Sequence, residues 1–163
     1  MSVSAIALFL TIPLRILCAA SLPQWDWNTP VLPVRATDPP LEDWQRRTAL
    51  FIYFSPECSH CTDSWPQVVE MARRAQASGL RVGGIATYAT SRADIEMFLE
   101  ALGEDVPVWF DSSHAVASTY GIKSVPKAIL VEPNGEVQLF GDLTPRRLGR
   151  VEAIAKRAAR VNQ

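Results

Sequence analysis

The chain has 163 residues, of which 16 are Lys or Arg and 17 are Asp or Glu, so its formal net charge is −1. This length fits one domain with short extensions, and the even charge balance gives no indication of a nucleic-acid surface. Cys18, Cys58 and Cys61 are the only cysteines, too few for a scaffold held together by disulfides. We therefore expect one hydrophobic core and one candidate cysteine pair.

The first 20 residues contain an apolar run from Val3 to Ala20 that ends in small residues, as a signal peptide does before its cleavage site. The run is also close to the length that spans a bilayer, although Arg15 interrupts it. We therefore expect residues 1–20 to be a signal peptide or an N-terminal membrane anchor, with cleavage left open. Both interpretations predict a periplasmic or extracytoplasmic protein, secreted or anchored; a start site assigned too early is the other alternative.

Residues 21–40 form a proline-rich segment, which contains Pro23, Pro30, Pro33, Pro39 and Pro40. Each proline fixes its own φ and favours an extended conformation for the residue before it. We interpret the segment as a partly ordered linker. The alternative is that Trp25 and Trp27 pack back onto the domain, which we expect to comprise residues 41–163.

Strand and helix patterns alternate along residues 41–163. Short apolar runs predict strands over 49–54, 81–88, 106–110, 128–131 and 136–140. Apolar periodicity with capping and stop signals predicts helices over 41–48, 59–78, 91–102, 114–120 and from residue 145 onward. Asn134-Gly135 between the last two runs predicts a β-hairpin. This order predicts an α/β fold in which helices cover both faces of a central mixed sheet.

Cys58-Ser59-His60-Cys61 stands where the first strand of this series meets the following helix. The N–H groups of the first helical turn and the helix dipole favour the thiolate of Cys58, which makes it the candidate nucleophile. Cys61 lies one turn further along and is the candidate resolving thiol. A zinc ribbon needs a second cysteine pair, and a haem site needs a histidine where Thr62 stands. A structural disulfide is the simpler alternative to a redox-active pair.

The stretch Phe51-Ile52-Tyr53-Phe54-Ser55-Pro56-Glu57-Cys58-Ser59-His60-Cys61 resembles the strand and active site of thioredoxin-like proteins. Pro66 matches the proline of their active-site helix, Val125-Pro126 resembles their cis-proline dipeptide, and Pro133-Asn134-Gly135 resembles the hairpin turn that follows. The resemblance covers roughly residues 41–160. The helix after the second core strand and the strand over 107–111 are similar to the exported TlpA/ResA branch.

This resemblance implies a thioredoxin-like fold with an extra helix-containing insert after the second core strand. It implies thiol-disulfide exchange with protein substrates, an upstream redox partner that restores the cysteine pair, and neither a metal nor an organic cofactor. The site residues that it implies are catalytic Cys58 and Cys61, supported by Ser59, His60, Val125 and Pro126. A cis peptide would align the Val125 backbone beside the sulfurs, where a substrate chain could pair with it; a proline that enters an edge strand is the alternative.

Three positions depart from the family pattern. Glu57 stands where many relatives have a tryptophan, and Ile52 occupies the position of the buried aspartate of thioredoxin. Thr90 lies near the place where some TlpA/ResA relatives carry a glutamate. No proton carrier for Cys61 is therefore evident from the sequence. His60, when protonated, could stabilise the Cys58 thiolate, or it could be an exposed spacer.

The direction of electron flow is the least determined part of the functional prediction. His60 beside Cys61 resembles the C-P-H-C site of the oxidant DsbA, which favours an oxidase. The whole-chain resemblance to TlpA/ResA-type reductases and the charge of Glu57 favour a reductase, which is the direction we predict. Two other functions use the same residues: Cu(I) binding by both thiolates with His60 or His114, and peroxide reduction through a sulfenic acid.

The last predicted helix is basic, with Glu152 as the only acidic residue among Arg146, Arg147, Arg150, Lys156, Arg157 and Arg160. A solvated helix face explains this pattern. Contact with anionic lipids is the alternative if residues 3–20 remain as an anchor, which would give the chain a membrane association.

Overall fold

The computed structural model of the chain describes residues 21–102, 106–141 and 143–161. The predicted signal peptide or anchor over residues 1–20 therefore lies outside the described residues. Within the described ranges, no helix combines the length and the apolar character that crossing a membrane requires.

A single mixed sheet of six strands lies at the centre of the molecule, in the order β1-β4-β3-β2-β5-β6. Strand β2 pairs in parallel with β3, and β3 pairs in parallel with β4, whereas the pairs β1·β4, β2·β5 and β5·β6 are antiparallel. The strands are β1 (Leu32–Pro33), β2 (Ala49–Phe54), β3 (Arg81–Ala86), β4 (Val108–Phe110), β5 (Lys127–Val131) and β6 (Val137–Phe140).

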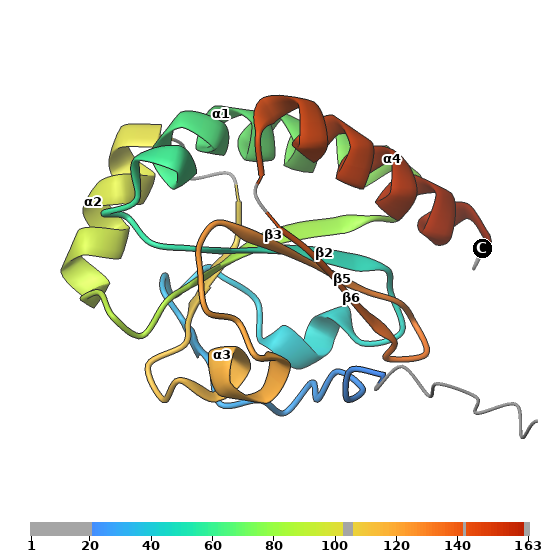
Figure 1. Cartoon of the computed structure of the whole chain (residues 1–163), viewed down its shortest axis with the longest axis horizontal. Helices are drawn as coiled ribbons and strands as arrows, with labels where there is room; N and C mark the ends of the chain where they lie inside the picture. The colour runs from blue at the N-terminus through green and yellow to red at the C-terminus, as the bar shows by residue number, and fades with distance from the viewer. Residues whose placement is uncertain (1–20, 103–105, 142, 162–163) are drawn as a thin grey trace, which may run out of the picture.

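Helices lie on both sides of this sheet (Figure 1). They are α1 (Ser59–Ala75), α2 (Arg92–Leu102), α3 (Ala115–Tyr120), α4 (Pro145–Val161) and the 3-10 helices η1 (Leu41–Trp44) and η2 (Gln76–Ser78). The predicted thioredoxin-like α/β class is confirmed, including the extra helix α2 between β3 and β4. The boundaries differ slightly from the predicted ones, since β3 ends at Ala86 and β4 begins at Val108.

The two faces of the sheet carry different layers. We call the face under α1, α2 and α4 the helical face, and the face under residues 21–40, η1 and α3 the aromatic face (Figure 1). Side chains alternate between these faces along each strand. In β2, Leu50, Ile52 and Phe54 belong to the buried cluster of the helical face, whereas Phe51 and Tyr53 belong to that of the aromatic face.

Residues 21–40 pack against the aromatic face, so the structure agrees with the alternative to the partly ordered linker that we predicted. Trp25 is 4% exposed and stacks on Phe51 and Tyr120, with ring centroids 5.2 and 5.0 Å away. The Trp25 N–H donates to the Gly135 carbonyl at 2.8 Å, and β1 pairs with β4. The segment is held although its only strand is short, because its rings are buried and its backbone has hydrogen-bond partners.

Several of the helix caps and stop residues predicted from the sequence are present in the structure. Gly79 ends η2 with a left-handed φ of 73°, a conformation that glycine adopts without steric cost. Ser91 and Asp94 form the predicted capping pair of α2, with the Asp94 N–H donating to the Ser91 Oγ at 3.2 Å. The Arg147 N–H donates to the Thr144 Oγ1 at 3.4 Å where α4 begins.

Candidate active site

Both cysteines lie where β2 gives way to α1. Cys58 is the residue before the first helical residue, and its carbonyl accepts hydrogen bonds from the N–H groups of Cys61 at 2.9 Å and Thr62 at 3.0 Å. The Cys58 N–H donates to the Ser55 carbonyl at 3.1 Å. These bonds fix Cys58 at the N-terminus of a 17-residue helix, the end that carries partial positive charge.

The two thiols differ in burial. Both are free, but Cys58 is half-buried whereas Cys61 is only 1% exposed. Burial raises the pKa of the Cys61 thiol well above its usual range, and the hydrogen bond with Cys58 and the Cys58 charge act in the same direction. The Ser55 backbone acts against them. An approaching disulfide therefore meets Cys58 first, and Cys61 stays protonated until its proton has an acceptor.

Val125 and Pro126 face this pair from the loop before β5. The Val125-Pro126 peptide bond is cis, which confirms the prediction drawn from the family resemblance. The Cys58 thiol donates to the Val125 carbonyl over 3.8 Å, within the range of a hydrogen bond to sulfur. The fold thus brings together two segments that are 67 residues apart in the sequence.

Ser59 and His60 occupy the exposed side of the first turn of α1. His60 lines a cavity of about 370 Å³ together with Val125, Pro126 and Leu143. This places His60 beside the loop that contacts Cys58. The supporting roles that the resemblance implies for Ser59 and His60 stay predictions.

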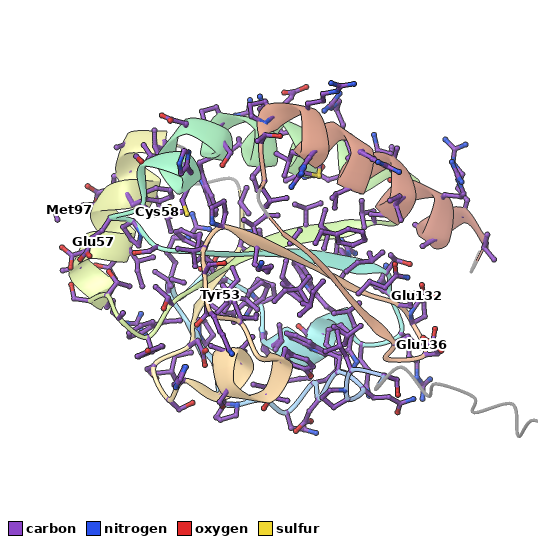
Figure 2. The ribbon with its side chains drawn as sticks, in the orientation of Figure 1. Tyr53, Glu57, Cys58, Met97, Glu132 and Glu136 are labelled. Atoms are coloured by element: carbon purple, nitrogen blue, oxygen red, sulfur yellow. The ribbon has the colours of Figure 1, made fainter. Side chains whose placement is uncertain are left out.

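The three departures from the family pattern have different surroundings. Ile52 is buried in the helical face, and Glu57 is exposed next to Cys58 (Figure 2). The Thr90 Oγ1 is buried and has no hydrogen-bond partner among the residues that the structure describes. The proton carrier for Cys61 therefore stays unassigned.

A second cavity, of about 590 Å³, lies on the other side of the Val125 loop. Its lining residues come from the carboxyl ends of β2 and β3, from α3 and from the loop that leads to Val125. His114, one of the two predicted candidates for a third copper ligand, lines this cavity and packs against Tyr88 in a tilted arrangement, with ring centroids 3.9 Å apart. Among the described residues, no group of three or more His, Cys, Asp or Glu side chains could hold a metal ion.

Sequence reasoning missed one buried acid next to this cavity. Asp111 is 0% exposed, and its carboxylate accepts from the Tyr53 hydroxyl at 3.0 Å and from the N–H groups of Val116 at 3.1 Å and Ala117 at 3.2 Å. Burial raises the pKa of Tyr53 well above its usual range. An aspartate directly after a predicted strand and shortly before a predicted helix is a capping signal that could have identified it.

Comparison with known proteins supplies the family context. The AhpC/TSA family model matches residues 32–140. Thiol-disulfide oxidoreductase ResA of Bacillus anthracis is 23% identical over 110 residues, which cover 66% of this chain and 63% of that protein. ResA of Geobacillus thermodenitrificans is 22% identical over 98 residues, which cover 60% of this chain and 56% of that protein. The matches therefore span less than two thirds of the length of these relatives.

Solved structures share the fold. A putative thiol:disulfide interchange protein DsbE from Chlorobium tepidum superposes with a TM-score of 0.71 and 22% identity, and the match covers 85% of this chain and 99% of that one. The exposed lipoprotein thioredoxin of Streptococcus pneumoniae superposes with a TM-score of 0.64 and 21% identity, over 76% of this chain and 96% of that one. At these identities the likeness establishes the thioredoxin-like fold.

Proposed function

The chain belongs to the AhpC/TSA family, and from this membership and the site geometry we propose that it is a thiol-disulfide oxidoreductase acting on protein substrates. One observation carries the proposal: a half-buried cysteine at the N-terminus of α1 is followed one turn later by a buried one. That asymmetry suits a nucleophile and a resolving thiol. A purely structural disulfide would not need one sulfur to remain accessible beside the Val125 carbonyl.

The proposed reaction transfers two electrons to the substrate in two exchange steps. The Cys58 thiolate attacks one sulfur of the substrate disulfide, so that a new S–S bond forms and the second substrate sulfur leaves as a thiolate. Cys61 then attacks Cys58, its proton passes to the substrate thiolate, and the substrate leaves fully reduced. The Cys58–Cys61 disulfide that remains must be reduced by an upstream dithiol protein before the next cycle.

The direction that we propose is reduction of the substrate. Similarity to ResA relatives supports it. A DsbA-like oxidase is the alternative, because His60 next to Cys61 can stabilise the thiolate. Equilibration of the pair in glutathione buffers distinguishes them: a potential near roughly −270 mV supports a reductase, and one near roughly −120 mV overturns it.

Trapping of mixed disulfides tests the assignment of the two cysteines. In a Cys61→Ser variant, Cys58 can still attack but cannot be resolved, so disulfide-linked complexes with substrate proteins should accumulate. Cys58→Ser should trap few or none, because Cys61 is buried. Equal trapping by both variants would contradict the assignment of Cys58 as the nucleophile.

We further propose that the protein works outside the cytoplasm, delivered or anchored by residues 1–20. The apolar run from Val3 to Ala20 supports this location. Fractionation of cells that express the full chain, compared with a chain lacking residues 1–20, tests the proposal. Recovery of both forms in the same compartment would contradict it.

A further inference from the structure

The 590 Å³ cavity has an aromatic rim that the proposed exchange reaction does not use. Tyr88, after the end of β3, is 48% exposed, and its ring lies 3.9 Å from the His114 ring, centroid to centroid, at 43°. His114 beside it is half-buried, and tyrosine rings, which have an apolar body and a polar tip, are enriched at interfaces. The rim therefore offers an open aromatic surface at the mouth of a cavity.

Backbone geometry holds His114 in this position. Its φ of 62° lies in the left-handed region, which residues other than glycine and asparagine seldom adopt. The His114 N–H donates to the Asp111 carbonyl at 3.0 Å, while the buried Asp111 carboxylate caps α3 through Val116 and Ala117. The rim is therefore preorganised, which lowers the entropy that a ligand must overcome.

Most side chains that line the cavity are uncharged, and the one lysine among them, Lys123, is exposed. Ala89, Ala117, Ile122 and Val125 supply apolar walls. Tyr53, Ser55 and Thr87 are its buried polar members, and the Tyr53 hydroxyl already donates to Asp111. Asp and Glu are absent from the described residues that line it. Its volume lies within the roughly 300–1,000 Å³ typical of ligand pockets.

Val125 joins the cavity to the reactive sulfur. Its carbonyl lies 3.8 Å from the Cys58 Sγ, and the same residue lines the cavity. A polypeptide bound to Cys58 through its own cysteine, and extended along Val125, advances roughly 3.3 Å per residue. Because Val125 borders both the sulfur and the cavity, a side chain a few residues from that cysteine can reach the cavity.

We propose that this cavity binds an aromatic side chain of the protein substrate, a short distance along the chain from the cysteine that bonds to Cys58. The proposal rests on the proposed exchange function and names a feature of its substrates. The substrate ring packs on the Tyr88–His114 pair and against the apolar walls. The cavity thus makes the protein selective for sequence as well as for an accessible disulfide.

Synthetic peptides test this selectivity. Each peptide carries one cysteine in a mixed disulfide with a chromogenic thiol and has Phe, Leu, Glu or Ala at the second and third positions on either side. We measure the second-order rate constant of the reduced full-length protein with each peptide. The Phe peptides should react roughly fivefold faster than the Ala peptides, since one aromatic contact contributes about this factor.

Two rim variants should remove the preference. His114→Asn keeps a residue that tolerates the left-handed backbone and deletes the ring, and Tyr88→Ser deletes its partner. In both variants the Phe-to-Ala ratio should fall to about twofold or less. Met97→Ala is the matched control, because Met97 is an exposed apolar side chain (60%) on α2, outside the lining of the cavity (Figure 2); its ratio should equal that of the unmodified protein.

The rate with glutathione disulfide, which has no aromatic ring, separates the two proposals. If the unmodified protein reacts with no disulfide, the exchange function fails and the cavity inference falls with it. If it reacts with glutathione disulfide and all peptides alike, or if the preference survives both rim variants, the cavity inference alone is overturned. A preference for Glu or Leu peptides over Phe peptides overturns it as well.

Discussion

The helical face and the aromatic face of the sheet bury the central strands in different ways. On the helical face, three helices pack their apolar stripes on the strands, and Phe54, Trp65 and Phe98 form one ring cluster. On the aromatic face, irregular chain lies over the stacked rings of Trp25, Trp27, Trp44, Phe51, Trp109 and Tyr120. The cysteine pair belongs to the first layer and the proposed recognition cavity mainly to the second, and Val125 packs against the clusters of both.

Truncation of one buried tryptophan on each face compares the two layers directly. Trp65 is 0% exposed on α1, and Trp25 is 4% exposed in the N-terminal segment. Replacement of Trp65 by Ala should lower the free energy of unfolding by about 3–5 kcal/mol, the usual cost for a buried ring. Trp25→Ala should cost about 3 kcal/mol if residues 21–40 are an integral layer. Urea denaturation of both variants gives the two values.

A loss below about 1 kcal/mol for Trp25→Ala, the range of substitutions outside the core, would mean that the N-terminal segment is a detachable cover. Trp25→Phe serves as a control, because it retains a ring between Phe51 and Tyr120. It also removes the Trp25 indole N–H, which is buried without a hydrogen-bond partner in the described part of the chain. This control should recover most of the stability lost in the Ala variant.

Two adjacent glycines in β3 allow the tightness of packing to be tested on each face of the sheet. A Cβ added at Gly84 would lie 2.7 Å from the Trp65 ring on the helical face, and one at Gly83 would lie 2.7 Å from Trp109 and 2.8 Å from Trp44 on the aromatic face. Each Gly→Ala change should therefore destabilise the protein by about 1–3 kcal/mol through overpacking. Thermal unfolding and denaturant titration measure the effect.

Combining each Gly→Ala change with a smaller ring at the contacting tryptophan distinguishes the effects at the two glycines. Trp65→Phe should relieve Gly84→Ala, because the colliding ring becomes smaller. Trp44→Phe should relieve Gly83→Ala only partly, because Trp109 remains within 2.7 Å of the added methyl group. Gly149→Ala in α4 is the control: its added Cβ meets nothing within 4 Å, so it should stabilise the helix by up to about 1 kcal/mol. If the second substitution restores the same amount of stability at both glycines, the two layers accommodate an added methyl group equally well.

The helical face could be predicted from sequence and the aromatic face could not, for a physical reason. Apolar periodicity in residues 59–78 and from residue 145 specifies which side of a helix is buried, so the layer follows from local pattern. The N-terminal segment has no period, and its burial depends on rings that lie far apart in the sequence, such as Trp25 and Tyr120. Local pattern carries no record of such pairings, and β1 has only two residues, too few for a strand period to show.

The candidate site also has a part that could be predicted from the sequence and a part that could not. The cysteine pair and the strand-to-helix junction follow from residues that are contiguous in sequence, and the family resemblance added Val125 and Pro126. The second cavity was not predicted, because Tyr53, Tyr88 and His114 come from three separate segments that only the folded sheet brings together. Asp111 was missed although its position before a helix is a capping signal.

Raising the pH above neutrality should lower the free energy of unfolding through one buried group on each face, and the two groups should act over different pH ranges. Burial raises the pKa of Cys61 on the helical face and of Tyr53 on the aromatic face. A folded-state pKa above the unfolded value contributes stability that is complete below the unfolded pKa and is lost as the pH rises above it. The loss should begin near pH 8.5 for Cys61 and near pH 10 for Tyr53, at up to about 1.4 kcal/mol per pH unit for each group.

The free energy of unfolding of the reduced protein, measured as a function of pH, gives the slope of this loss. One variant on each face tests which group causes it. Cys61→Ala should flatten the slope between about pH 8.5 and 10, and Tyr53→Phe should flatten it only above about pH 10. Tyr53→Phe should also cost about 1–3 kcal/mol at neutral pH, since Asp111 loses a hydrogen-bond donor. An unchanged slope in Cys61→Ala would contradict the raised pKa of the buried thiol.

The smallest effects on stability are expected at two exposed positions, a helix cap over the helical face and a turn over the aromatic face. Ser91 caps α2 over the helical face: its Oγ accepts from the Asp94 N–H at 3.2 Å and donates to the Asp94 carboxylate at 2.5 Å. Asp26 forms a turn over the aromatic face, where its Oδ1 accepts from the Asn28 N–H at 2.9 Å. A helix cap satisfies an N–H that the helix leaves unpaired, so its loss weakens the whole first turn.

Ser91→Ala should therefore lower the free energy of unfolding by about 1 kcal/mol, and Asp26→Ala by about 0.5 kcal/mol or less, because water can replace an exposed partner. Ser91→Asp, which preserves a capping oxygen, should restore most of the loss despite its charge next to Asp94. Thermal unfolding at moderate salt, which screens that repulsion, measures all three. If Asp26→Ala costs more than Ser91→Ala, the exposed turn contributes more to holding Trp25 and Trp27 on the sheet than its side-chain hydrogen bonds with Asn28 imply. The aromatic face is then the more dependent on its surface contacts.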